Sequence, residues 1–333
     1  MQYLTQILVR WCLSCMALLF VWCRAAPLPA IGTVADGPAR VTFMGWTNTW
    51  RISNGAAELF VVPDIGARVV GYRLLGATNV VDVHPTYAGT LRAFTPPQQS
   101  VPYGGGKLWA APQGGAGWPG SGWPPNAYWE NGRGYLAPVG PRCLQLSSPP
   151  VSTSVLQFGR SIVLAPTGSA VTLHHRMRNV SAQTVTSAVW AINPMALPCQ
   201  VIAPIGRYYW GTASNAFAVT NGVLYKAIST TDGKKLFIAA DKPWLAGMTT
   251  NMLWVMWADA YDARTAATNE ASIEIWYGQT EAHGFAELEL QGPAVVLKPG
   301  QHTDYRMYWQ LCRLAQPTLA DALAALRAMG LLE

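Results

Sequence analysis

The sequence has few charged residues and no cluster of one sign. Only 12% of its 333 residues are Asp, Glu, Lys or Arg, and the formal net charge is +6. No run of Lys or Arg forms a basic stripe, so nucleic acid is not an expected partner. Hydrophobic residues make up 50% of the chain, which indicates a large core.

The sequence is also poor in cysteine and lacks common catalytic motifs. Beyond the N-terminal segment only Cys143, Cys199 and Cys312 remain, widely spaced and without a CxxC pair. This spacing argues against a zinc site, allows at most one intramolecular disulfide and is typical of buried thiols. No Gly-x-Ser-x-Gly motif is present, and Lys107 follows three glycines without P-loop spacing. We therefore expect neither a cofactor nor a metal.

The first residues resemble a secretory signal. Arg10 ends a short n-region, and residues 11–22 form an apolar run that is too short to span a bilayer as a helix. The small residues Ala25 and Ala26 follow. We expect a signal peptide over residues 1–26 and a periplasmic or secreted mature chain without an integral membrane span. An uncleaved anchor is the alternative.

Most of the remaining chain has the pattern of short strands. Alternating apolar and polar stretches end at Gly, Pro, Asn or Asp. Only the last residues favour a helix, with Thr318 as N-cap and Asp321 at the capping-box position. We predict an all-β antiparallel β-supersandwich over residues 27–316, followed by a short C-terminal helix in residues 317–333. Expected strands include 57–62, 170–179, 185–192, 217–219, 235–240, 252–258, 271–277, 285–290 and 302–311.

The expected strand 170–179 has one apolar and one basic face. His175 falls on the apolar face, whereas His174 and Arg176 fall on the other. This pattern predicts a sheet that is wetted on one side. His174 and Arg176 are candidates for binding an anionic or hydroxylated ligand, and His175 is expected to be a hydrogen-bonded core histidine. Arg68 is a further ligand-binding candidate; it lies in an apolar strand and needs an acceptor if it is buried.

Residues 103–135 combine glycine, proline and aromatic residues without a helix or strand period. They indicate an ordered loop, because disordered segments lack aromatic residues. Flat rings with a polar edge suit the C–H faces of a sugar, although they can also cap one end of a sandwich. Trp123, ahead of two prolines, is expected to be exposed, and Trp109 to be core near the site. The ligand-binding candidates here are Tyr103, Lys107, Trp109, Trp123 and Trp129.

Two glutamates share a face of the expected strand 285–290. Glu287 and Glu289 lie two residues apart, so both point to the same side. Close carboxylates shift each other's pKa and suit acid–base work or the binding of sugar hydroxyls. The alternatives are a solvated face or a structural network with Arg68 or Lys107.

Six stretches of the sequence form a recognisable combined pattern: 63–68, 103–113, 123–125, 178–179 with 190–192, 287–289 and 297–300. Together they resemble the galactose-mutarotase-like superfamily. The resemblance covers nearly all of the chain beyond the signal, and it implies a β-supersandwich with a sugar site on a concave sheet face.

The resemblance also implies one catalytic glutamate and two histidines, of which this sequence keeps only the first. The glutamate base falls on Glu289, but Tyr103 holds the place of one histidine and no histidine lies near residues 188–190. Trp190, close to that place, is a further ligand-binding candidate. We therefore expect an exported carbohydrate-binding protein. The alternatives are an aldose 1-epimerase or other sugar isomerase that uses Glu289 as base, and a structural envelope protein whose aromatic residues only pack.

Overall fold

The computed structural model describes residues 37–92, 100–120, 122–149 and 155–333. The signal expected in residues 1–26 lies outside this part. The chain divides into one unit of residues 33–317 and a second that includes residues 318–333. No helix within the described residues is long and apolar enough to cross a membrane.

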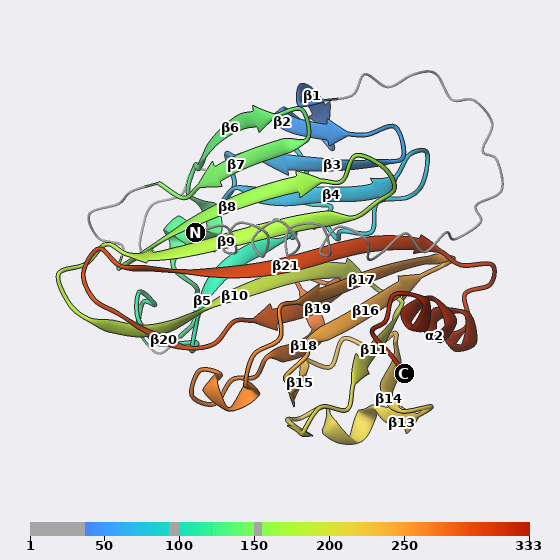
Figure 1. Cartoon of the computed structure of the whole chain (residues 1–333). Helices are drawn as coiled ribbons and strands as arrows, with labels where there is room; N and C mark the ends of the chain where they lie inside the picture. Colours follow the sequence, from blue (N-terminus) through green and yellow to red (C-terminus); the bar gives the residue numbers. More distant parts are fainter. Residues whose placement is uncertain (1–36, 93–99, 121, 150–154) are drawn as a thin grey trace, which may run out of the picture. The chain divides into compact units, whose positions relative to one another are not determined.

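The described part of the larger unit consists of three antiparallel sheets, which Figure 1 shows with the four-stranded sheet at the top. The four-stranded sheet has the order β1 (Ala39–Phe43), β2 (Trp46–Ser53), β3 (Ala57–Val62), β4 (Arg68–Leu74). The seven-stranded sheet has the order β12 (Tyr208–Trp210), β15 (Lys234–Ala239), β18 (Ile273–Thr280), β19 (His283–Gln291), β10 (Val185–Ala196), β20 (Val295–Leu297), and β5 (Lys107–Ala111) also pairs with β10. The ten-stranded sheet has the order β13 (Ala218–Thr220), β14 (Val223–Ile228), β11 (Cys199–Pro204), β16 (Trp244–Thr249), β17 (Met252–Ala258), β21 (His302–Arg313), β9 (Val171–Asn179), β8 (Leu156–Leu164), β7 (Cys143–Ser147), β6 (Tyr135–Gly140). The predicted all-β antiparallel sandwich is confirmed.

The seven-stranded and ten-stranded sheets share one apolar core. Trp254 and Trp309 of the ten-stranded sheet and Leu288 of the seven-stranded sheet are buried in the same cluster. The sheets approach so closely that a Cβ on Gly247 of β16 would lie 2.6 Å from the Met195 sulfur and 2.8 Å from Leu288. A side chain at this position would have to displace Met195 and Leu288. The facing sides of the two sheets therefore form the core.

The predicted C-terminal helix is also confirmed. Helix α2 covers Leu319–Ala328, and the Thr318 side chain accepts a hydrogen bond from the Asp321 amide at 3.2 Å. This contact satisfies one of the amides that a helix leaves unpaired at its start.

The segment 103–135 is not a single loop without secondary structure, so that prediction is wrong. Residues Lys107–Ala111 form β5, and Ala127–Asn131 form the short helix α1. Strand β5 pairs with the middle of β10, with Trp109 opposite Trp190. All five of its residues are buried, so the strand shows no alternation of apolar and polar residues. A strand that is stabilised by pairing with a distant segment, and buried on both faces, is difficult to recognise from its own sequence.

Candidate functional site

Strands β18 and β19 place four side chains on one face of the seven-stranded sheet. Glu274 lies opposite Glu289 in the antiparallel register, and Trp276 lies opposite Glu287. Every second residue of a strand points to the same face, so all four side chains share it. Two carboxylates therefore stand side by side, next to a tryptophan and a third carboxylate.

Lys235 of β15 binds both carboxylates of the first pair. Its Nζ lies 2.8 and 2.6 Å from the Oε1 and Oε2 atoms of Glu289, and 2.8 Å from Oε2 of Glu274. From β10, the indole Nε1 of Trp190 donates a hydrogen bond to Oε2 of Glu289 at 2.7 Å. Glu289 is thus fixed between an ammonium group and an indole.

Burial sets the protonation of this cluster. Together with the nearby Glu274 and Glu287 carboxylates, it raises the pKa of Glu289 to about 8 against the attraction of Lys235. Burial likewise raises the pKa of Glu274 to about 8. Burial lowers the pKa of Lys235, but the two carboxylates outweigh this effect and leave the pKa above its ordinary value. Since one ammonium faces two buried carboxylates, the carboxylate pair changes charge near neutral pH.

A second ion network joins β5, α1 and β19. Lys107 Nζ lies 3.2 Å from Oε1 of Glu287 and 3.6 Å from Oε1 of Glu130. Arg68 Nη2 lies 2.5 Å from the same Glu130 oxygen, and Trp109 Nε1 donates to the other at 2.8 Å. Burial raises the pKa of Glu130, but Arg68 and Lys107 outweigh it and hold the pKa below its usual range. Glu130 therefore stays ionised and fixes Lys107.

These two networks lie along a cleft of about 780 Å³ that is also lined by several aromatic rings. Phe237, Trp276 and Phe285 contribute rings from the sheet, and Trp123 contributes one from the segment between β5 and α1. Trp123 is 66% exposed, and its ring centroid lies 6.4 Å from that of Trp109. The volume is typical of a small-molecule site. Such a cleft suits a ligand with both an apolar face and several polar groups.

A glycine gives Trp276 its place in the cleft. A Cβ on Gly278, two residues along β18, would lie 2.4 Å from the Trp276 ring. The ring therefore occupies the space that a side chain at this position would take, with its centroid 5.2 Å from that of Phe285. Any larger residue at position 278 would displace the ring.

Comparison with known proteins now identifies the family. The family model described as a domain of unknown function, DUF4380, matches residues 48–312. The chain belongs to the DUF4380 family. A search of curated proteins finds no match.

Solved structures show that this DUF4380 chain has the galactose-mutarotase-like fold that its sequence resembles. A candidate aldose 1-epimerase from Klebsiella pneumoniae has a TM-score of 0.60 and 10% identity, with 90% of this chain and 89% of the other covered. A galactose mutarotase related enzyme from Lactobacillus acidophilus has a TM-score of 0.54 and 10% identity, with 81% and 100% covered. A galactose mutarotase-like protein from Lactobacillus casei has a TM-score of 0.54 and 10% identity, with 79% and 100% covered.

The structure brings six of the residues predicted from the sequence into the cleft and leaves two just behind it. Arg68 is fully buried, and it binds the backbone carbonyls of Ile65, Gly104 and Glu130 as well as the Glu130 carboxylate. Tyr103 is also buried, with its hydroxyl accepting from the Arg92 amide. The six that line the cleft are Lys107, Trp109, Trp123, Trp190, Glu287 and Glu289.

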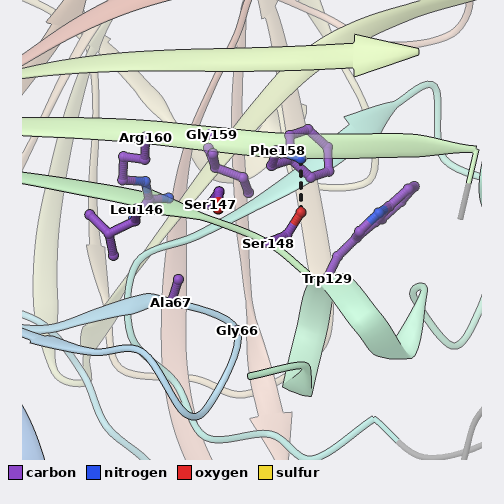
Figure 2. A pocket seen from close by; sticks show the side chains of 10 residues that line it. Gly66, Ala67, Trp129, Leu146, Ser147, Ser148, Phe158, Gly159 and Arg160 are labelled. Carbon is purple, nitrogen blue, oxygen red and sulfur yellow. Dashed lines mark hydrogen bonds between the residues drawn. The ribbon is translucent and has the colours of Figure 1, made fainter. Parts of the chain in front are cut away.

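Trp129 lies away from the cleft. Figure 2 shows it beside Phe158, near a small hollow lined also by Arg160 and Gly66. Its indole Nε1 donates to the Leu156 carbonyl at 3.2 Å, so its polar edge is used within the core. The hollow holds only about 20 Å³, which is close to the space of one water molecule. Trp129 therefore supports the fold here and does not share the cleft with Glu289.

His174 and Arg176 lie on another sheet. They line a hollow of about 1030 Å³ over β8, β9 and β21 of the ten-stranded sheet, where Arg176 binds Asp304 through two hydrogen bonds of 2.7 and 2.9 Å. The predicted one-sided wetting of β9 is confirmed. His175 is buried as expected, but neither ring nitrogen has a hydrogen-bond partner among the described residues, so the expectation of a bonded core histidine is wrong. Burial lowers its pKa well below the ordinary value, which keeps it neutral.

Sequence reasoning missed three central residues: Glu130, Lys235 and Glu274. Glu274 had a usable signal, since it is the only charged residue between Ile273 and Tyr277 of an apolar strand. Among the described residues, no group of three or more His, Cys, Asp or Glu side chains is arranged to hold a metal. In the part of the chain that the structure describes, no disulfide joins Cys143, Cys199 and Cys312, and Cys143 is only half-buried.

Proposed function

We propose that this chain binds carbohydrate in the cleft between the two ion networks and the aromatic rings. The main support for this proposal is that an exposed tryptophan, Trp123, lines the same cleft as carboxylates and ammonium groups that the ion networks hold in place. A sugar ring has apolar C–H faces and a polar edge, so it matches both kinds of lining. Because residues 1–26 resemble a signal peptide, we also propose that the chain acts outside the cytoplasm.

Replacing Trp123 with alanine tests the aromatic platform. We expect the variant to bind sugar about 1 to 3 kcal/mol more weakly, as for other interface anchors. Its free energy of unfolding should change little, because an exposed ring gives up little buried area. Carbohydrate arrays identify a ligand, and titration calorimetry with urea denaturation then gives both quantities.

Trp109→Ala is the matched control on the same side of the cleft. Trp109 is only 4% exposed and donates to Glu130, so its loss should cost about 3 to 5 kcal/mol of stability. If the parent binds sugar and Trp123→Ala binds it with the same affinity, the Trp123 ring does not serve as a stacking platform for the sugar.

Glu289 supports a second candidate function, that of a sugar isomerase or aldose 1-epimerase. Its pKa of about 8 lies close to neutral pH, where a general acid or base is most effective. Against this function, none of the described residues that line the cleft is a histidine. The histidine partners implied by the family resemblance therefore have no counterpart among them.

Polarimetry distinguishes binding from isomerisation. We expect mutarotation of galactose and glucose to be weak, since each missing acid–base partner typically contributes about 10² to 10⁴ in rate. Glu289→Gln should then leave the rate unchanged. Rapid mutarotation that rises with pH through about 8 and disappears in Glu289→Gln would instead establish the enzyme.

A further inference from the structure

The cleft has more carboxylates than cations, although the whole chain carries a net charge of +6. Of the residues that line it, six are glutamates and two are lysines, and Arg68 adds one cation behind. Even with Glu274 and Glu289 both protonated, four carboxylates face three cations. The negative charge is therefore a local property of the cleft. The six glutamates are Glu130, Glu270, Glu274, Glu281, Glu287 and Glu289.

Two resident ammonium groups show how this cleft holds a cation. Lys107 Nζ lies 3.2 Å from the Glu287 carboxylate and 4.3 Å from the ring centroid of Trp109. Lys235 Nζ binds Glu289 and lies 5.0 Å from the ring centroid of Trp190. Each ammonium thus combines a charge-assisted hydrogen bond with an aromatic face.

The same chemical groups recur in the cleft without a resident cation. Within the described part of the chain, neither Glu270 nor Glu281 is in an ion pair, and the rings of Trp123, Trp276 and Phe285 belong to the same lining. Glu270 Oε1 accepts from the Gln113 amide at 2.7 Å. Glu270 is thus held by a backbone amide and by the neighbouring Glu274 carboxyl, and no lysine or arginine of the described residues forms an ion pair with Glu270 or Glu281.

The backbone at Glu281 supports a role in binding. Glu281 and Ala282 form the two-residue turn between β18 and β19, with φ of 49° and 65°. Turns of this kind favour asparagine and glycine, since other residues are strained at positive φ. Glutamate nevertheless stands here, lines the cleft and accepts a hydrogen bond from the Tyr87 hydroxyl at 2.5 Å.

We propose that the cleft selects a sugar that carries a free amine, such as a glucosamine unit, over neutral sugars and over sugar phosphates and uronic acids. This inference rests on the carbohydrate-binding function proposed above. The ammonium group of the sugar binds the Glu270 or Glu281 carboxylate. It does so in the same way that each lysine ammonium group binds its own glutamate in this cleft. An anionic sugar meets the excess negative charge and is excluded.

The test compares oligosaccharides of glucosamine with their N-acetylated counterparts, which have the same linkage but no charge. Titration calorimetry at about pH 6, where an amine resembling an α-amino group is protonated, should give at least about tenfold tighter binding of the free amine. The difference should shrink with added salt, because screening weakens exposed charge pairs. Glucose 6-phosphate and glucuronic acid should not bind.

Glu270→Gln and Glu281→Gln should each lower the ratio of amine to N-acetyl affinity, whereas Asp304→Asn on the ten-stranded sheet should leave it unchanged. Equal affinity for the two oligosaccharides, or tighter binding of the acetylated one, overturns the inference and leaves carbohydrate binding in place. If no sugar of any charge binds, the proposed function itself fails.

Discussion

Arg68→Met is expected to destabilise the protein by about 3 to 5 kcal/mol, because the buried Glu130 carboxylate loses its nearest cation and keeps the more distant Lys107, 3.6 Å away. The Glu130 carboxylate, 2.5 Å from the Arg68 guanidinium, is almost fully buried. Methionine fills a similar volume but cannot donate to Glu130 or to the carbonyls that Arg68 binds. Urea denaturation followed by circular dichroism measures the loss.

Two further variants make this result specific. Arg68→Met/Glu130→Gln removes both charges and should recover part of the loss, since a neutral amide can still accept from Trp109. Arg176→Met, which breaks an exposed pair with Asp304, should cost less than about 1 kcal/mol. If Arg68→Met costs no more than Arg176→Met, the buried pair does not hold this region together.

The sequence predicted those features that depend on local alternation. The two faces of β9 and the shared face of Glu287 and Glu289 follow from the two-residue period of a strand, and the structure shows both. The need of Arg68 for an acceptor also followed from its apolar surroundings. The identity of its partner, Glu130, could not be predicted in this way, because Glu130 lies in α1, 62 residues further along the chain. Pairings across such distances are set by the sheet topology.

The cleft was predicted only in part for the same reason. Trp123 could be distinguished from Trp109 by its neighbours, two prolines against an apolar run. The position of Trp129 outside the cleft could not be predicted from its neighbours, because its burial depends on contact with β8. Lys235 meets Glu289 only after β15, β18 and β19 have paired. The pairing of several strands decides which charged residues meet in this cleft. The sequence can therefore reveal an isolated charged residue in an apolar strand, but it does not reveal the partner of that residue.

Lys235→Met is expected to have an effect that depends strongly on pH. In the parent protein, burial holds the pKa of Glu274 and Glu289 at about 8, above the value of about 4.3 for an unfolded glutamate. The folded state therefore binds more protons than the unfolded state between these values. The free energy of unfolding falls as the pH rises from about 4 to about 8, by up to about 1.4 kcal/mol per pH unit for each carboxylate.

Loss of the Lys235 ammonium raises both carboxyl pKa values further, so the fall continues to a higher pH than in the parent. At about pH 5 the folded carboxyls keep their protons, so Lys235→Met should change stability little. Above about pH 8 the folded parent releases these protons beside Lys235, whereas the variant must either hold them against the rising pH or bury ionised carboxylates without this cation. The loss should therefore grow with pH and reach about 3 to 5 kcal/mol. Urea denaturation at both pH values measures it.

Lys234→Met is the matched control for this prediction, since it changes the neighbouring residue of the same strand. Lys234 is exposed and pairs with Asp232 at 2.8 Å on the opposite face of β15. An exposed pair contributes little to stability, so this variant should follow the parent at every pH. A Lys235→Met loss of equal size at about pH 5 and about pH 8.5 would mean that the ammonium acts through packing and not through the charge of the two glutamates. A loss that grows with pH would mean that Lys235 determines the protonation of the Glu274 and Glu289 carboxyls in the cleft.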